Sequence, residues 1–122
     1  TDWLYQAFSE HKKITLFEDV WFSPLHIDQL ASALEWVGEK QPTGIFNLGA
    51  RDGISKAGFA LKFANRLGLD TSAAGFGKLA EEQFNALRPL DMQLNVGEFE
   101  HLRGAKLPDI ELVISATVAD YS

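Results

Sequence analysis

The segment 44–67 constrains the fold most, because an extended apolar run is followed within a few residues by a long amphipathic helix pattern. The run GIFNL ends at Gly49 and predicts a strand over 44–48. Ser55 is a good N-cap for a helix over Lys56–Leu67. The apolar stripe of this helix recurs at alternating steps of one and three residues: Phe59, Ala60, Phe63, Ala64 and Leu67. Two periodicities this close together predict helices and strands within one unit.

The other predicted elements are short. Apolar spacing predicts helices at three further places: Asp2–Lys13, Ile27–Val37 and Val96–Leu102. Leu79–Phe84 is a candidate for one helical piece, and the last segment, Leu107–Val118, is a further helix candidate. In Ile27–Val37, the expected stripe is Leu30, Leu34 and Val37, with Ala31 and Ala33 beside it. We expect an α+β fold, with about four to five helices and short strands, and a single domain over residues 1–122.

Three further segments are predicted as strands or loops from their own residues alone. Residues Ile14–Phe17 are a strand candidate. The segment Glu18–Pro24 is predicted as a loop or a short edge strand, since Pro24 cannot donate to a sheet ladder. The segment Asp70–Gly77 is small and glycine-rich and is expected to be an ordered loop.

Charge and composition exclude several function classes. The chain has 122 residues and a formal net charge of −6, whereas nucleic-acid binding needs clustered Lys and Arg. The densest basic stretch is only 11–13. There is no cysteine, which removes disulfides and thiolate chemistry and fits a cytoplasmic location. No apolar run approaches the roughly 18 residues of a membrane span, so we expect no membrane partner.

Catalytic and metal-binding motifs are not evident. His11, His26 and His101 share no ligand spacing, so we expect surface or packing roles. The turn Gly49–Gly53 precedes a helix but has the spacing of neither a dinucleotide-binding loop nor a P-loop. Tyr5 is followed four residues later by Ser9 and not by Lys. We therefore predict no catalytic residue, cofactor-binding residue or metal ligand in this chain.

Three stretches, in order, resemble the C-terminal half of extended short-chain dehydrogenase/reductases, in the NAD-dependent epimerase/dehydratase superfamily. The dTDP-4-dehydrorhamnose reductase branch is the most similar. The stretches are FEDVWFSPLHIDQLASAL, GIFNLGARDGISKAGFALKFANRLGL and RPLDMQLNVGEFEHLRGAKLP. The matching positions are Asp19, Pro24, Leu30 and Ala31; Gly44, Phe46, Gly49, Ser55, Phe59 and Ala60; and Arg88, Pro89, Leu94, Gly104, Leu107 and Pro108. Gln29 and Met92 depart from the family pattern.

The resemblance implies a partial protein on the substrate side. Complete members have an N-terminal Rossmann domain that binds NAD or NADP and carries a Tyr-x-x-x-Lys pair. Those elements are not found in this sequence, so we expect the chain to lack the Rossmann half and to be inactive by itself. An Arg in the place of Arg88 helps to hold the nucleotide phosphates in relatives. By the same resemblance, Trp21 and Phe22 lie beside the base, with Ser23 a weaker candidate.

Two functions remain open from the sequence. One is a nucleotide-sugar-binding portion of an NAD(P)-dependent reductase or epimerase, with the Rossmann domain as its partner. The other is a non-catalytic interaction or regulatory module that exposes an apolar face and self-associates as a homo-oligomer. The site residues also have structural alternatives: Arg88 as a solvated or ion-paired loop residue, and Trp21 and Phe22 as core or interface packing.

Overall fold

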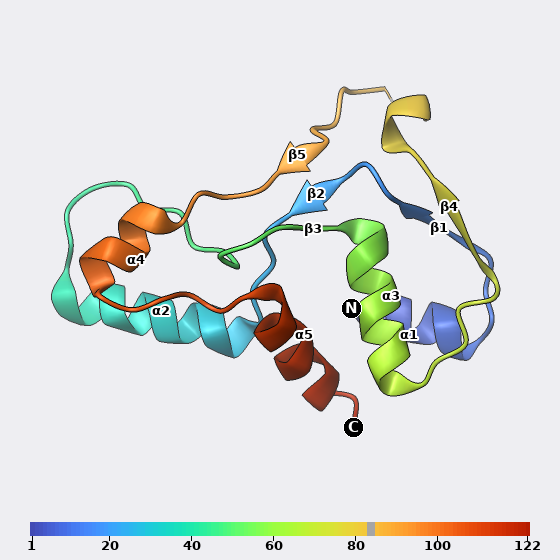
Figure 1. The fold of residues 1–122 in the computed structure, drawn as a ribbon, viewed down its shortest axis with the longest axis horizontal. Helices are drawn as coiled ribbons and strands as arrows, with labels where there is room; N and C mark the ends of the chain where they lie inside the picture. The colour runs from blue at the N-terminus through green and yellow to red at the C-terminus, as the bar shows by residue number, and fades with distance from the viewer. Residues whose placement is uncertain (83–84) are drawn as a thin grey trace.

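The computed structural model describes residues 1–82 and 85–122. Its helices are α1 (Asp2–Ser9), α2 (Ile27–Lys40), α3 (Lys56–Leu67), α4 (Gly97–Arg103) and α5 (Ile110–Ala119), with a 3₁₀ turn η1 (Leu79–Glu81). Its strands are β1 (Ile14–Phe17), β2 (Trp21–Phe22), β3 (Ile54–Ser55), β4 (Ala74–Gly77) and β5 (Asp91–Met92). The predicted α+β class is confirmed, and Figure 1 shows helices and short strands interleaved along the chain.

Helix α3 is the centre of the main core. The Ser55 hydroxyl accepts the Gly58 N–H at 3.0 Å and caps the helix, as predicted. Phe63 is fully buried, and α3 packs on α1, β1 and α5. The predicted bounds and apolar stripe of this helix are confirmed, because its cap and its periodicity are both encoded locally. The other buried members of this core come mainly from the three neighbouring elements: Leu4, Phe8, Leu16, Ile110, Val113 and Ile114.

A second, smaller core lies between α2 and α4. Its buried members are Ala33, Val96, Phe99 and Leu107. Trp36 meets Phe99 edge-on, with ring centroids 5.5 Å apart. The expected stripe on α2 was therefore partly wrong: Leu34 is 51% exposed and Ala31 is exposed. Contact with Phe99 turns the Ala33 and Trp36 side of the helix inward.

The strands form two small sheets. Strand β1 pairs with β4 in parallel, with Ile14 opposite Ala74, so the predicted loop over Asp70–Gly77 was wrong at its second half. The other sheet has the order β3-β2-β5. Strand β2 is thus central and not an edge strand, and Pro24 lies beyond its end. Both differences arise from pairing with segments distant in sequence, which local patterns do not reveal.

The predicted strand over 44–48 is absent from the sheets of the described residues. This segment is held by isolated bonds instead. The Asn47 amide donates to the Asn95 carbonyl at 3.1 Å, and the Ala50 N–H donates to the Ser23 carbonyl at 3.4 Å. Its apolar side chains Phe46 and Leu48 pack on the smaller core. The apolar run therefore reflects burial of Phe46 and Leu48 without a ladder.

Other boundaries differ by a few residues. Helix α1 ends at Ser9 and not at Lys13, since His11 has a left-handed backbone (φ 51°) that interrupts the helix. The predicted helix over Leu79–Phe84 is a 3₁₀ turn over Leu79–Glu81, and residues 83–84 lie outside the described part. None of the helices in the described ranges is long and apolar enough to cross a membrane.

Candidate functional site

The predicted site residues Trp21 and Phe22 lie on β2, but they face opposite sides of its sheet. Successive strand residues point to alternate faces. Phe22 turns toward the main core and meets Phe59 edge-on at 5.8 Å. Trp21 is 42% exposed on the other side. A single ligand on one face of the sheet can therefore contact only one of these two rings.

The chain brings the Arg88 segment beside Trp21. In the parallel pair of β2 and β5, Trp21 lies opposite Asp91, and its N–H donates to the Leu90 carbonyl at 2.7 Å. Arg88 is exposed, two residues before Leu90, and it has an interaction partner within the chain. Residues remote in sequence thus converge at one end of the sheet.

Ser23 has a structural role. Its hydroxyl accepts the Leu94 N–H at 3.1 Å, and its carbonyl accepts the Ala50 N–H. A Cβ on Gly49 would lie 2.9 Å from the Ser23 carbonyl oxygen, so glycine is needed for this close approach. Ser23 therefore joins three segments at the end of β2.

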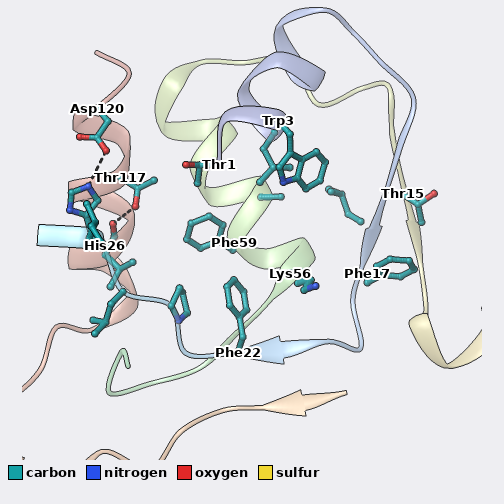
Figure 2. A pocket seen from close by; sticks show the side chains of 17 residues that line it. Thr1, Trp3, Thr15, Phe17, Phe22, His26, Lys56, Phe59, Thr117 and Asp120 are labelled. Atoms are coloured by element: carbon teal, nitrogen blue, oxygen red, sulfur yellow. Dashed lines mark hydrogen bonds and ion pairs between the residues drawn. The ribbon is translucent and has the colours of Figure 1, made fainter. Parts of the chain in front are cut away.

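A cavity of about 590 Å³ opens on the Phe22 side of the sheet. Figure 2 shows it between β2, α3 and β1, with His26 and Asp120 at one end and Thr15 and Phe17 at the other. Most of its wall is apolar or aromatic. No local sequence pattern marks this cavity, because its walls come from α1, β1, β2, α3 and α5 together.

Lys56 brings a positive charge to this cavity. It is the first residue of α3, is exposed, and its backbone N–H donates to the Val20 carbonyl at 2.8 Å. No carboxylate of the described residues lies within ion-pairing distance of its ammonium. In the sequence, the only sign that Lys56 could serve a ligand site is its position at the start of a helix that follows a strand.

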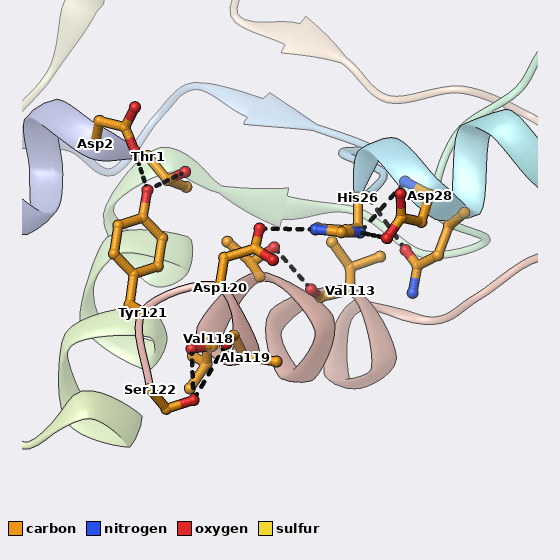
Figure 3. Close-up of polar contacts among 12 residues, drawn as sticks. Thr1, Asp2, His26, Asp28, Val113, Val118, Ala119, Asp120, Tyr121 and Ser122 are labelled. Carbon is orange, nitrogen blue, oxygen red and sulfur yellow. Dashed lines mark hydrogen bonds and ion pairs between the residues drawn. The ribbon is translucent and has the colours of Figure 1, made fainter.

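His26 organises the opposite end of the cavity. Its Nε2 lies 2.9 Å from Oδ2 of Asp120, while its Nδ1 accepts the Asp28 N–H at 3.3 Å (Figure 3). The Gln29 side chain accepts the His26 N–H and completes a capping box for α2. The imidazole, only 10% exposed, thus ties α2 to α5. Within the described ranges, no three potential ligands group as a metal site.

The chain ends meet beside this site. The Tyr121 hydroxyl donates to the Asp2 carboxylate and lies 3.0 Å from the Thr1 hydroxyl, as Figure 3 shows. Burial, reinforced by the Asp2 carboxylate, raises the pKa of the Tyr121 hydroxyl above its ordinary value. Tyr121 also stacks on Tyr5 at 4.9 Å. These contacts bring Thr1 and Asp120 to the cavity wall.

Asp19, one of the positions in the family pattern, has structural partners. Its carboxylate accepts the N–H groups of Leu79 at 2.7 Å and Ala80 at 3.0 Å. Desolvation raises the pKa of the Asp19 carboxyl, but these N–H donors outweigh it and hold that pKa below its ordinary value. An acid that stays ionised while capping a turn is suited to structure and not to proton transfer.

The turn Gly49–Gly53 does not fit a dinucleotide. A Cβ on Gly49 would meet the Ser23 backbone, and a Cβ on Gly53 would overlap the Gln93 side chain. Both glycines therefore face protein atoms, whereas a phosphate-binding loop presents its backbone to the ligand. The turn Gly49–Gly53 therefore joins segments of the fold by close packing.

Neither a family model nor a curated protein sequence matches the chain. Solved structures do match. One is a dTDP-4-dehydrorhamnose reductase from Bacillus anthracis in complex with NADP, with a TM-score of 0.83 and 16% identity over 94% of this chain and 41% of that one. The chain has the fold of part of a dTDP-4-dehydrorhamnose reductase. A hypothetical reductase of this name from Sulfolobus tokodaii gives a TM-score of 0.73 and 23% identity over 90% of this chain and 40% of that one.

A solved structure of a second kind of enzyme also matches the chain. A dTDP-glucose 4,6-dehydratase from Bacillus anthracis, in complex with NAD, matches with a TM-score of 0.75 and 16% identity, over 98% of this chain and 37% of that one. The chain therefore spans about two fifths of the length of the reductases that it matches. This coverage fits the expected C-terminal part of such a protein, and these identities establish the fold alone.

Proposed function

We propose that this chain is the nucleotide-sugar-binding portion of an NAD(P)-dependent reductase or epimerase and does not turn over substrate by itself. The observation that carries the proposal is the likeness of 94% of the chain to 41% of a dTDP-4-dehydrorhamnose reductase. The matching enzymes were solved with NADP or NAD. The cofactor and its reaction belong to the part of such proteins that this chain does not resemble.

The ligand is proposed to lie on the Trp21 face of the β3-β2-β5 sheet. The exposed indole offers a flat apolar surface for a base. Arg88, on the segment that leads into β5, suits a diphosphate because its guanidinium donates in a fixed fork. Phe22 packs on the opposite face against Phe59, and Ser23 holds the Leu94 segment at the end of β2.

Calorimetric titration with dTDP and dTDP-glucose tests this proposal. We expect binding that weakens by about 10- to 100-fold in Arg88→Ala, since a charge-assisted hydrogen bond contributes roughly 1.5–3 kcal/mol. Arg88→Lys should recover only part of the loss, because lysine lacks the fork. Lys106→Ala, at an exposed site before α5, is the control. Equal affinity of the Arg88 variants and the parent would contradict the assignment.

The second candidate is a non-catalytic interaction module that self-associates. Two exposed apolar side chains at the cavity favour it: Trp3 is 59% exposed and Ile27 is 68% exposed. Apolar groups clustered at a concave surface are typical of protein contacts. Sedimentation across a concentration series distinguishes the two candidates. Self-association without any response to a dTDP-sugar would favour the module.

A further inference from the structure

The outer face of α2 is apolar and exposed. It consists of four residues at helical spacing: Ile27, Ala31, Leu34 and Gly38. Residues at i, i+4, i+7 and i+11 form one row along a helix. Ile27 is 68% exposed and Leu34 is 51% exposed, although burial of such side chains is favourable. Figure 1 shows α2 along the rim of the molecule, and the other side of the helix, with the buried Ala33, packs on the smaller core.

An acidic row runs beside this outer face. Asp28, Glu35 and Glu39 each follow a residue of the apolar row by one position, and all three are exposed. Within the described ranges, the carboxylates of Glu35 and Glu39 take part in no ion pair. Lys40, the only basic residue of α2, projects to the far side of the helix at 3.6 residues per turn. The outer face therefore combines apolar surface with negative charge that the chain does not neutralise.

Two residues of α2 lower the stability of the helix without an internal reason. Gly38 lies inside the helix, and a Cβ there would meet no atom within 4 Å, although glycine is destabilising in a helix relative to alanine. Glu39 lies in the last turn, where the helix dipole disfavours a negative charge. Residues that depart from local stability are expected where a surface serves a function. A missing side chain at Gly38 also leaves room for another backbone to approach closely.

The pattern of the apolar row suits a helix as its partner. Large and small residues alternate along it, in the order Ile27, Ala31, Leu34 and Gly38. The side chains of a second helix can enter the grooves that the small residues leave, as in the packing of ridges into grooves. Charged residues beside the apolar row of paired helices then select the partner by opposite charge. The acidic row of α2 thus calls for a helix with basic flanks.

A second copy of the chain does not supply this positive charge. A two-fold pair with antiparallel α2 helices would set the two acidic rows side by side. A two-fold pair with parallel helices would set each acidic row against Leu30 and Val37, which flank the other side of the apolar row. Like charges brought together oppose association, and the net charge of −6 adds to this repulsion. The partner is therefore a different, basic molecule.

We propose that the outer face of α2 docks a basic amphipathic helix of a partner protein. The apolar stripe of that helix packs on Leu34 and closes over Gly38, and its Lys or Arg side chains pair with Glu35 and Glu39. The docking face shares no residue with the Trp21 face, so this inference goes beyond the proposed function and does not depend on it.

Fluorescence anisotropy of a labelled amphipathic peptide tests the docking face. The probe is a synthetic helix of Leu and Lys with the 14-residue length of α2. We expect saturable binding that weakens as salt screens the charges. A peptide with the same Leu and Lys in scrambled order, and one with Glu in place of Lys, should bind about tenfold more weakly or less. Absence of binding to the probe, or equal binding of the scrambled peptide, would overturn the proposal.

Two variants test the apolar contact. Gly38→Leu adds bulk that meets no atom of the chain but blocks the close approach of a helix, and Leu34→Ser removes the apolar anchor. Each should lower the affinity by about tenfold, as loss of an interface anchor does. Leu87→Ser, at a fully exposed site in another segment, should leave it unchanged. Thermal unfolding followed by circular dichroism reports whether each variant is folded, and Gly38→Leu should melt no lower than the parent. Unchanged affinity in Gly38→Leu would contradict close packing of a helix.

A charge-matched pair of double variants separates specific pairing from net charge. Glu35→Lys with Glu39→Lys should lower the affinity for the probe by roughly tenfold or more. Glu81→Lys with Glu82→Lys makes the same change in net charge at exposed positions remote from α2 (Figure 1) and should lower it far less. Equal losses in the two double variants would reduce the binding to general attraction and overturn the proposal. Self-association of the chain that Leu34→Ser abolishes would place a second copy on this face and overturn the stated occupant.

Discussion

Trp21 lies directly opposite Asp91 in the parallel pair of β2 and β5. This register joins two of the three stretches in which the sequence resembles the reductase family. It places the exposed indole beside the segment that carries Arg88, although far more chain separates these residues than any local pattern spans. The proposed ligand face therefore exists only after β5 has docked on β2.

Replacement of Trp21 by alanine should weaken dTDP binding. Stacking of a base on an aromatic ring contributes about 1–3 kcal/mol, so we expect affinity to fall by roughly 5- to 150-fold. The indole is 42% exposed and its backbone pairing is unaffected by truncation, so the fold should be retained. Calorimetry gives the affinity. Phe22→Leu, on the opposite face, is the matched control and should change affinity little; a larger loss there would move the site into the cavity.

His26→Ala should destabilise the chain without affecting dTDP binding. The imidazole caps α2 and lies 2.9 Å from the Asp120 carboxylate, so its loss removes a cap and the link to α5. We expect the free energy of unfolding to fall by about 1–2 kcal/mol, in the range of lost helix caps. Urea denaturation measures it. Asp120→Ala combined with His26→Ala should cost less than the sum of the single changes, and strict additivity would contradict the coupling.

Two phenylalanines of similar size should differ sharply in their contribution to stability. Phe63 is fully buried, and its truncation to alanine should cost about 3–5 kcal/mol. Phe76 is 55% exposed in the isolated chain, and the same change should cost less than about 0.5 kcal/mol. Thermal and urea unfolding measure both. A large loss for Phe76→Ala would mean that the β4 face is covered in solution, for example by a second copy.

Stability should decline at acid pH, partly through Asp19. Its carboxyl has a pKa below the ordinary 3.8 in the folded chain, because the Ala80 and Leu79 N–H groups outweigh desolvation. A lowered folded pKa stabilises the fold above the unfolded pKa, and that contribution is lost as pH falls through the folded pKa. Urea unfolding between pH 6 and pH 2, roughly the range over which such linkage is lost, should show a shallower decline for Asp19→Asn. An identical slope in both proteins would exclude this linkage.

Elements with complete local signals were predicted correctly. Helix α3 has its Ser55 cap, its apolar stripe and its terminal Gly68 within one short segment, and its predicted bounds match the structure. Strand β1 was predicted from four apolar and β-branched residues. The strand predicted over 44–48 had the same kind of signal and is wrong, since Phe46 and Leu48 pack on the smaller core without a ladder partner.

The sequence by itself determined the α+β character, the helix at the centre of the core and the resemblance to the C-terminal half of a reductase family. These follow from caps, periodicity and short motifs, which act over a few residues. Tertiary structure alone decided that Gly75 and Phe76 belong to a strand, that Trp21 and Phe22 face apart, and that a cavity opens between β1, β2 and α3. The physical reason is that sheet register and cavity walls depend on pairing between remote segments, and no local window contains both partners.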